Sequence, residues 1–141
     1  MFDAVDTKTA MGRRDYARLL FMYNTGARVQ ETADLRVSWL HFAQPCRVEI
    51  IGKGRKQRIC PLWKNTGSIL ESLLAEHYSS PSQDTRVFLN RSDHPLSRFG
   101  ISNIIAKYQR QAAYRFPSLQ NKHVTPHTIR HTTAMHLLQS G

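Results

Sequence analysis

Three side chains that can bind or protonate an anion recur with helical spacing near residue 130. His127, Arg130 and His131 follow Thr125 and Pro126, which are residue types preferred at the N-cap and the first position of a helix. Spacings of three and four residues place the three side chains on one face of that helix. An imidazole and a guanidinium on one helix face are suited to holding an anionic group.

Two earlier segments carry further cations at points where the chain is expected to turn. Arg28 stands at the start of a short predicted helix, with Glu31 one turn later. The pair is either a surface ion pair or an arginine held by a carboxylate and directed at an anion, and the local residues favour neither. Lys53 lies between two glycines at the tip of a hairpin predicted over residues 47–61. A lysine there is either solvated or, with glycines beside it, able to enter a groove closely.

These cations together suit chemistry on a phosphodiester. Two guanidiniums, Arg28 and Arg130, can bind the non-bridging oxygens of one phosphate and favour the extra charge of a pentacoordinate transition state. Lys53 and His127 can exchange protons with the attacking and leaving oxygens. We therefore expect a site that needs no metal, nucleotide or other cofactor.

Other site chemistries are poorly supported by the sequence. Neither of the nucleotide-binding patterns GxxxxGK[ST] and GxGxxG is present. A zinc site built from His123, His127, His131 and His136 would lack cysteine and acidic partners. A metal-dependent nuclease needs carboxylate clusters, whereas the chain has ten Asp and Glu and none after Asp93.

The charge of the chain predicts a polyanionic partner. Twenty Lys and Arg against ten Asp and Glu give a net charge of +10, which is a large excess for a small domain. The basic residues cluster on the predicted hairpin and on a late helix. Those expected to contact a DNA backbone are Arg55, Lys56, Arg58, Lys107 and Arg110.

Hydrophobic periodicity predicts a mainly α-helical α+β domain with a small three-stranded antiparallel sheet. Helices are expected over residues 13–23, 65–78 and 97–116, with Gly26 ending the first and Ser97 capping the last. The hairpin is expected to gain its third strand from residues 87–89. Residues 1–12 are interpreted as a lead-in and residues 13–141 as one domain.

Compartment and redox state follow from features that the sequence lacks. No apolar run approaches membrane-spanning length and no secretory signal is recognisable, so we expect a cytoplasmic, nucleoid-associated protein. Cys46 and Cys60 have no metal-binding spacing and are expected to be reduced core residues.

Four ordered segments resemble the tyrosine recombinase (phage integrase, Xer-like) family. They are residues 25–31 (TGARVQE), 52–58 (GKGRKQR) followed by Pro61 and Leu62, 87–89 with 95–97 (VFL, PLS), and 127–131 (HTIRH) leading to 136–138 (HLL). A lone HxxR would be weak evidence, but four segments in the family's order are specific. The resemblance extends over roughly residues 13–141.

The resemblance implies a role for each candidate residue. Arg28 and Arg130 would clamp the scissile phosphate, Lys53 would protonate the leaving 5′ oxygen, and His127 would assist proton transfer. Glu31 would orient Arg28 from behind. His131 matches a position that is more often structural. Duplex DNA and further recombinase protomers, assembled as a tetramer, would be the partners.

One departure from the family concerns the nucleophile. The family's nucleophilic tyrosine lies downstream of HxxR, whereas the five tyrosines of this sequence all precede it: Tyr16, Tyr23, Tyr78, Tyr108 and Tyr114. None of them is expected to act as nucleophile, so the resemblance implies a catalytic domain that is incomplete at its C-terminus. Two functions remain open: the DNA-binding part of a recombinase that works through a 3′-phosphotyrosine, or a non-catalytic DNA-binding or interaction remnant of one.

Overall fold

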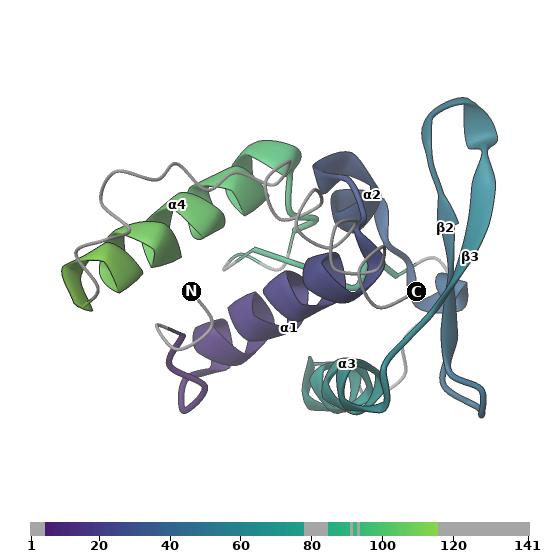
Figure 1. Ribbon diagram of the computed structural model, residues 1–141, viewed down its shortest axis with the longest axis horizontal. Helices are drawn as coiled ribbons and strands as arrows, with labels where there is room; N and C mark the ends of the chain where they lie inside the picture. The colour runs from purple at the N-terminus through teal and green to yellow at the C-terminus, as the bar shows by residue number, and fades with distance from the viewer. Residues whose placement is uncertain (1–4, 78–84, 91, 93, 116–141) are drawn as a thin grey trace, which may run out of the picture.

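The fold is mainly helical, with one small sheet at its side. The computed structural model describes residues 5–77, 85–90, 92 and 94–115. A central helix α1 (Ala10–Thr25) has α4 (Arg98–Arg115) on one side and α3 (Lys64–His77) on the other, as Figure 1 shows. The short helix α2 (Val29–Asp34) lies between α1 and the hairpin of β2 (Arg47–Ile51) and β3 (Gln57–Pro61). The predicted fold class is confirmed.

Helix α1 is longer than its apolar pattern predicts. Thr9 caps it, because its hydroxyl accepts a hydrogen bond of 2.9 Å from the Gly12 amide. Gly26 ends it as predicted, in the left-handed conformation with φ of 66°. The expected lead-in therefore includes the first turn of α1, and Val5 before it is buried against the core.

The sheet has the predicted hairpin but a different third strand. The register of β2 and β3 runs from Arg47 opposite Pro61 to Ile51 opposite Gln57. The third strand is β1 (Leu40–His41), which pairs antiparallel with the other side of β2.

The prediction that residues 87–89 form the third strand is wrong. Val87 donates its amide hydrogen to the Leu35 carbonyl instead, and Leu89 forms an isolated bridge with Pro95. Val87 and Phe88 are both buried, and the Phe88 ring packs edge-on against Phe21 at 6.1 Å. A short apolar run buried on both sides serves the core and does not need to extend a half-exposed sheet.

Two apolar clusters share α1 between them. One joins Phe21 of α1 to the sheet, to α3 and to Phe88, and the other joins Leu19 and Met22 to α4. Leu70, Leu73 and Leu74 of α3 are buried, and Ile69 is partly buried against the same cluster. On α4, Ile101, Ile105 and Tyr108 are buried and Ile104 is partly buried.

A buried polar network ties α1 to α4, and apolar periodicity does not reveal it. Asp15 accepts a hydrogen bond of 3.0 Å from the Arg18 guanidinium and one of 2.5 Å from the Tyr108 hydroxyl. Arg18 also donates to the Leu89 carbonyl at 2.7 Å and lies over the Phe88 ring. Burial lowers the pKa of Arg18 to about 10, and burial with the hydrogen bond to Asp15 raises the pKa of Tyr108.

The two cysteines are free thiols, as expected. Cys46 is buried and Cys60 is partly buried. Burial raises the pKa of both thiols, which keeps them protonated and weakly nucleophilic. Across the helices that the structure describes, none is long and apolar enough to cross a membrane.

The network predicts a stability cost for losing the Tyr108 hydroxyl. Tyr108→Phe leaves the buried Asp15 carboxylate without one of its donors, and we expect the free energy of unfolding to fall by about 1–3 kcal/mol. Urea denaturation followed by circular dichroism measures it. A Tyr108→Phe protein as stable as the wild type would show that the hydroxyl contributes nothing to the α1–α4 contact.

Candidate active site

Arg28 is placed by the backbone geometry at the start of α2. It is the N-cap residue, with an extended conformation, and its carbonyl accepts hydrogen bonds from the Thr32 amide at 2.9 Å and hydroxyl at 3.0 Å. Its own amide hydrogen is donated to Glu31 Oε1 at 2.8 Å. The backbone of Arg28 is therefore fixed on both sides, while its side chain is exposed.

Glu31 makes a second contact that the sequence does not predict. Arg58 of β3 donates from Nη1 to Glu31 Oε2 at 2.7 Å and from Nη2 to Oε1 at 3.2 Å. The Glu31 side chain is 7% exposed and the Arg58 side chain is 41% exposed. Arg58, predicted to contact DNA, is thus bound to a carboxylate of the same chain by a two-pronged ion pair while its side chain stays partly exposed. No local pattern signals this pair, because 27 residues separate its members.

The hairpin tip is a tight turn built on two left-handed residues. Gly54 has φ of 73° and Arg55 has φ of 59°, and the Arg55 amide donates to the Gly52 carbonyl at 3.1 Å. Lys53 begins the 3-10 turn Lys53–Arg55, so the backbone confirms its predicted place at the tip.

Gly52 lies against the Glu31 side chain. A Cβ atom at this position would lie 2.7 Å from Glu31 Oε2, which is closer than Cβ atoms approach an oxygen in real structures. The backbone next to Lys53 therefore rests against the Glu31 carboxylate.

One carboxylate thus joins two of the predicted site elements. Glu31 holds the Arg28 backbone, lies against Gly52 next to Lys53, and binds Arg58 on the returning strand. His127, Arg130 and His131 lie outside the described residues, and only the backbone of Lys53 is described. The site roles of these residues stay predictions.

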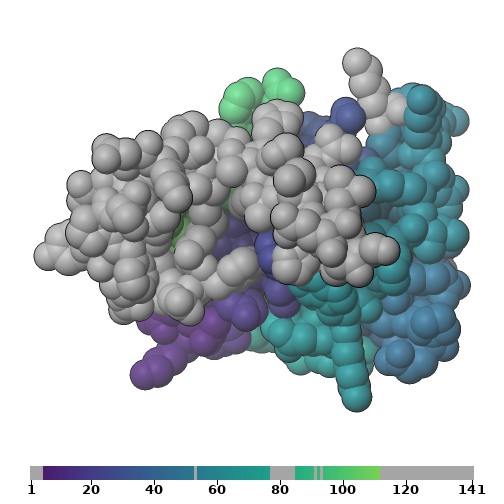
Figure 2. Space-filling view, viewed as in Figure 1, coloured from purple at the N-terminus to yellow at the C-terminus, as the bar shows by residue number. Residues whose placement is uncertain are grey.

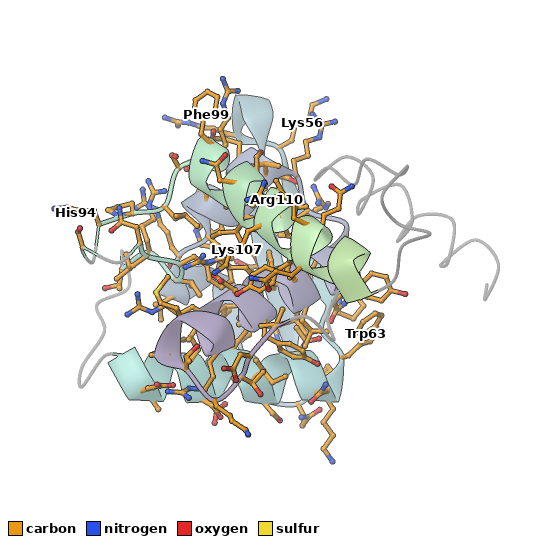
Figure 3. All side chains as sticks on the ribbon, turned by 90° about the vertical axis from the view of Figure 1, so that its left-hand side faces the viewer. Lys56, Trp63, His94, Phe99, Lys107 and Arg110 are labelled. Carbon is orange, nitrogen blue, oxygen red and sulfur yellow. The ribbon has the colours of Figure 1, made fainter. Side chains whose placement is uncertain are left out.

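Exposed basic residues lie near this end of the molecule and along α4. Arg55, Lys56, Lys107 and Arg110 are all exposed, as predicted. Figure 2 shows the hairpin in teal and the start of α4 in green reaching the surface along the upper edge of the view. In Figure 3, Lys56 lies at the same end as the start of α4, and Lys107 and Arg110 lie further along that helix.

The start of α4 adds a feature that the periodicity analysis does not single out. Ser97 caps this helix by accepting from the Gly100 amide at 3.1 Å. Phe99 is 67% exposed, and the Arg98 guanidinium lies 5.0 Å from the centre of its ring. An outward aromatic in an acid-free, basic helix is the only sequence signal that could have drawn attention to it.

Tyr108 has the opposite chemistry to an activated nucleophile. Its hydroxyl is buried against Asp15, and its pKa is raised by burial and by that carboxylate. The Tyr23 ring packs edge-on against Trp63 at 5.6 Å. Both tyrosines serve packing, in keeping with the expectation that neither acts as nucleophile.

The described residues also contain a cavity apart from the predicted site, and they contain no metal-binding cluster. A cavity of about 330 Å³ between α1 and α3 is lined partly by Tyr16, Ile69 and Leu73. Within the described ranges, no group of three or more His, Cys, Asp or Glu side chains could hold a metal ion. The four histidines of the zinc interpretation lie outside those ranges.

A mainly helical domain with a small antiparallel sheet, an arginine at a helix start and a lysine-bearing hairpin is the arrangement that the resemblance to tyrosine recombinase catalytic domains implies. The sequence model of the phage integrase family matches residues 1–141. The chain belongs to this family, and the resemblance carried by its four segments is confirmed.

Several relatives are similar over the whole chain. The tyrosine recombinase XerD of Listeria innocua is 37% identical over 145 residues, and XerC of Oceanobacillus iheyensis is 36% identical over 146 residues. Each match covers 100% of this chain and 46% of the relative. The crystal structure of XerA recombinase superposes with a TM-score of 0.81 at 26% identity, covering 99% of this chain and 47% of that one. The chain therefore spans less than half the length of these relatives.

The left-handed turn predicts a difference between two substitutions at Gly54. Gly54→Ala should lower the free energy of unfolding by about 1 kcal/mol, because alanine is strained at positive φ. Gly54→Asn should cost less, because asparagine tolerates that conformation. Parallel urea unfolding curves compare the two variants, and equal losses would argue against strain as the cause.

Proposed function

We propose that this chain is the phosphate-binding part of a site-specific DNA recombinase. Arg28 and Arg130 grip the non-bridging oxygens of the scissile phosphate, and Lys53 donates a proton to the leaving 5′ oxygen. His127 assists the proton transfers, while Glu31 and His131 support these residues from behind. The observation that carries the proposal is the Glu31 carboxylate, which holds the Arg28 backbone and abuts the hairpin next to Lys53.

The reaction needs a hydroxyl nucleophile besides these groups. A tyrosine oxygen attacks the phosphorus atom, the bond to the 5′ oxygen breaks, and a 3′-phosphotyrosine and a free 5′-hydroxyl result. Attack by the 5′-hydroxyl of a partner strand reverses the step and exchanges strands. The chain works with further recombinase protomers as a tetramer on duplex DNA, in the cytoplasm and on the nucleoid. It requires no metal or cofactor.

Charge supports duplex DNA as the partner. The chain carries a net charge of +10, and the exposed residues Arg55, Lys56, Lys107 and Arg110 lie on the hairpin tip and α4. Binding of such side chains to phosphates releases counterions, so that affinity falls with the salt concentration. The alternative function is DNA binding without catalysis, and it would use the same basic surface.

The surface predicts a salt dependence that substitutions can test. Fluorescence anisotropy with a labelled duplex, between about 50 and 200 mM salt, gives the slope of log K against log salt. Arg55→Gln/Lys56→Gln should reduce the slope by up to about 0.9 for each phosphate that the variant no longer neutralises. Lys107→Gln/Arg110→Gln should act in the same direction.

The matched control removes two charges elsewhere. Lys8→Gln/Lys64→Gln changes two exposed lysines, one just before α1 and one at the first residue of α3, and it should leave the slope close to that of the wild type. If the control pair lowers the slope as much as Arg55→Gln/Lys56→Gln does, binding depends on the overall charge and not on this surface. Absence of salt-sensitive binding by the wild-type chain would refute the proposed function.

Phe99 predicts a contact of another kind. An exposed ring beside Arg98 can contact apolar parts of bases in a groove. Phe99→Ala should therefore weaken binding at every salt concentration with an unchanged slope, because an apolar contact releases no counterion. The same anisotropy titrations measure this, and unchanged affinity would place Phe99 outside the interface.

A further inference from the structure

We propose that Arg58 is a positioning residue: through Glu31 it fixes the distance between the hairpin tip that carries Lys53 and the helix start that carries Arg28. This inference rests on the proposed function, because it concerns the same site. It reassigns Arg58, which by its sequence alone belongs with the residues that contact the DNA backbone.

Glu31 provides an acceptor for each terminal nitrogen of the Arg58 guanidinium. Both terminal nitrogens of its guanidinium bind the two oxygens of Glu31, at 2.7 and 3.2 Å. This planar two-pronged contact is among the strongest that a carboxylate makes, and it fixes orientation as well as distance. Because Glu31 is buried, separating the pair would leave a largely desolvated carboxylate without its charged partner.

The Glu31–Arg58 pair connects β3 to α2 and adds a polar contact to the apolar packing of β2 in the core. Arg58 belongs to β3 and Glu31 to the first turn of α2. Glu31 Oε1 also accepts the Arg28 amide hydrogen, and Oε2 lies so close to Gly52 that a Cβ atom there would come within 2.7 Å of it. The hairpin of β2 and β3 stands at the edge of the fold beside α2 in Figure 1. Sliding the hairpin along α2 would break these contacts together.

Direct and indirect roles for Arg58 predict effects of opposite sign when Glu31 is neutralised. If Arg58 bound a DNA phosphate, Glu31→Gln would release it and raise the net charge, so DNA would bind more tightly. If Arg58 positions the hairpin, Glu31→Gln weakens binding although the protein becomes more basic. Glu49→Gln is the matched control, because Glu49 lies on β2 in the same hairpin and contacts His41 at 3.6 Å. It removes the same charge away from the site.

The experiment measures affinity for a labelled duplex by anisotropy, with the 141-residue chain and its variants. We expect Glu31→Gln and Arg58→Gln each to weaken binding by roughly threefold or more, and the double variant to bind no worse than the weaker single variant. Glu49→Gln should bind as well as the wild type or better. Tighter binding by Glu31→Gln, or additive losses in the double variant, would overturn the inference.

Arg58→Lys separates the two roles further. Lysine keeps the charge and contacts a phosphate as a point charge, but it cannot form the two-pronged pair with a carboxylate. A positioning role predicts that Arg58→Lys stays as weak as Arg58→Gln. Recovery of wild-type affinity and salt slope by Arg58→Lys would show a direct phosphate contact instead.

Gly52→Ala tests the same contact without changing any charge. Its Cβ would lie 2.7 Å from Glu31 Oε2, while φ of −102° is acceptable for alanine. The added methyl group therefore forces the hairpin backbone and Glu31 Oε2 apart. We expect a folded Gly52→Ala protein to bind the labelled duplex more weakly. Unchanged binding would contradict the inference, and this variant decides the question if Glu31→Gln does not fold. Absence of salt-sensitive binding by the wild type would instead refute the proposed function, and the inference with it.

Discussion

The buried carboxylate of Glu31 is the interaction on which the arrangement of the candidate site depends. A charge shielded from water is stable only when donors surround it. Glu31 finds them in the Arg28 amide and the Arg58 guanidinium. Because those donors belong to a helix start and to a returning strand, satisfying one carboxylate fixes two elements that are far apart in the sequence. The absence of a side chain at Gly52 completes the fit.

Helix α1 gives these elements a rigid base. It contributes to both apolar clusters, with Phe21 on one side and Leu19 and Met22 on the other. The buried Asp15–Arg18–Tyr108 network holds α4 against it in a defined orientation, since hydrogen bonds are directional while apolar packing alone tolerates sliding. The basic face of α4 is thereby held relative to the rest of the domain.

Local patterns predict the elements of the fold well and its long-range polar contacts poorly. The β2–β3 hairpin, the Gly26 stop and the Ser97 cap follow from turn and capping chemistry within a few residues. Residues 87–89 mislead because a short apolar run suits a strand and a buried core segment equally. The Glu31–Arg58 and Asp15–Tyr108 contacts span 27 and 93 residues, and periodicity carries no information on which charges meet at such separations. The sequence therefore places Glu31 near the site but assigns its partner on β3 to DNA.

The distribution of charge partners explains how a domain with a net charge of +10 stays folded and still presents a cationic surface. Asp15, Glu31, Asp34 and Glu76 each accept hydrogen bonds from an arginine of the fold. Acidic side chains are thus engaged where elements meet, and they stabilise the contacts between helices and strands. The hairpin tip and α4 then present basic side chains at exposed positions. Repulsion between such exposed cations is screened by water and salt, whereas a polyanion placed against them would relieve it directly. A fold that pairs several of its carboxylates with its own arginines is for this reason complementary to a phosphate backbone.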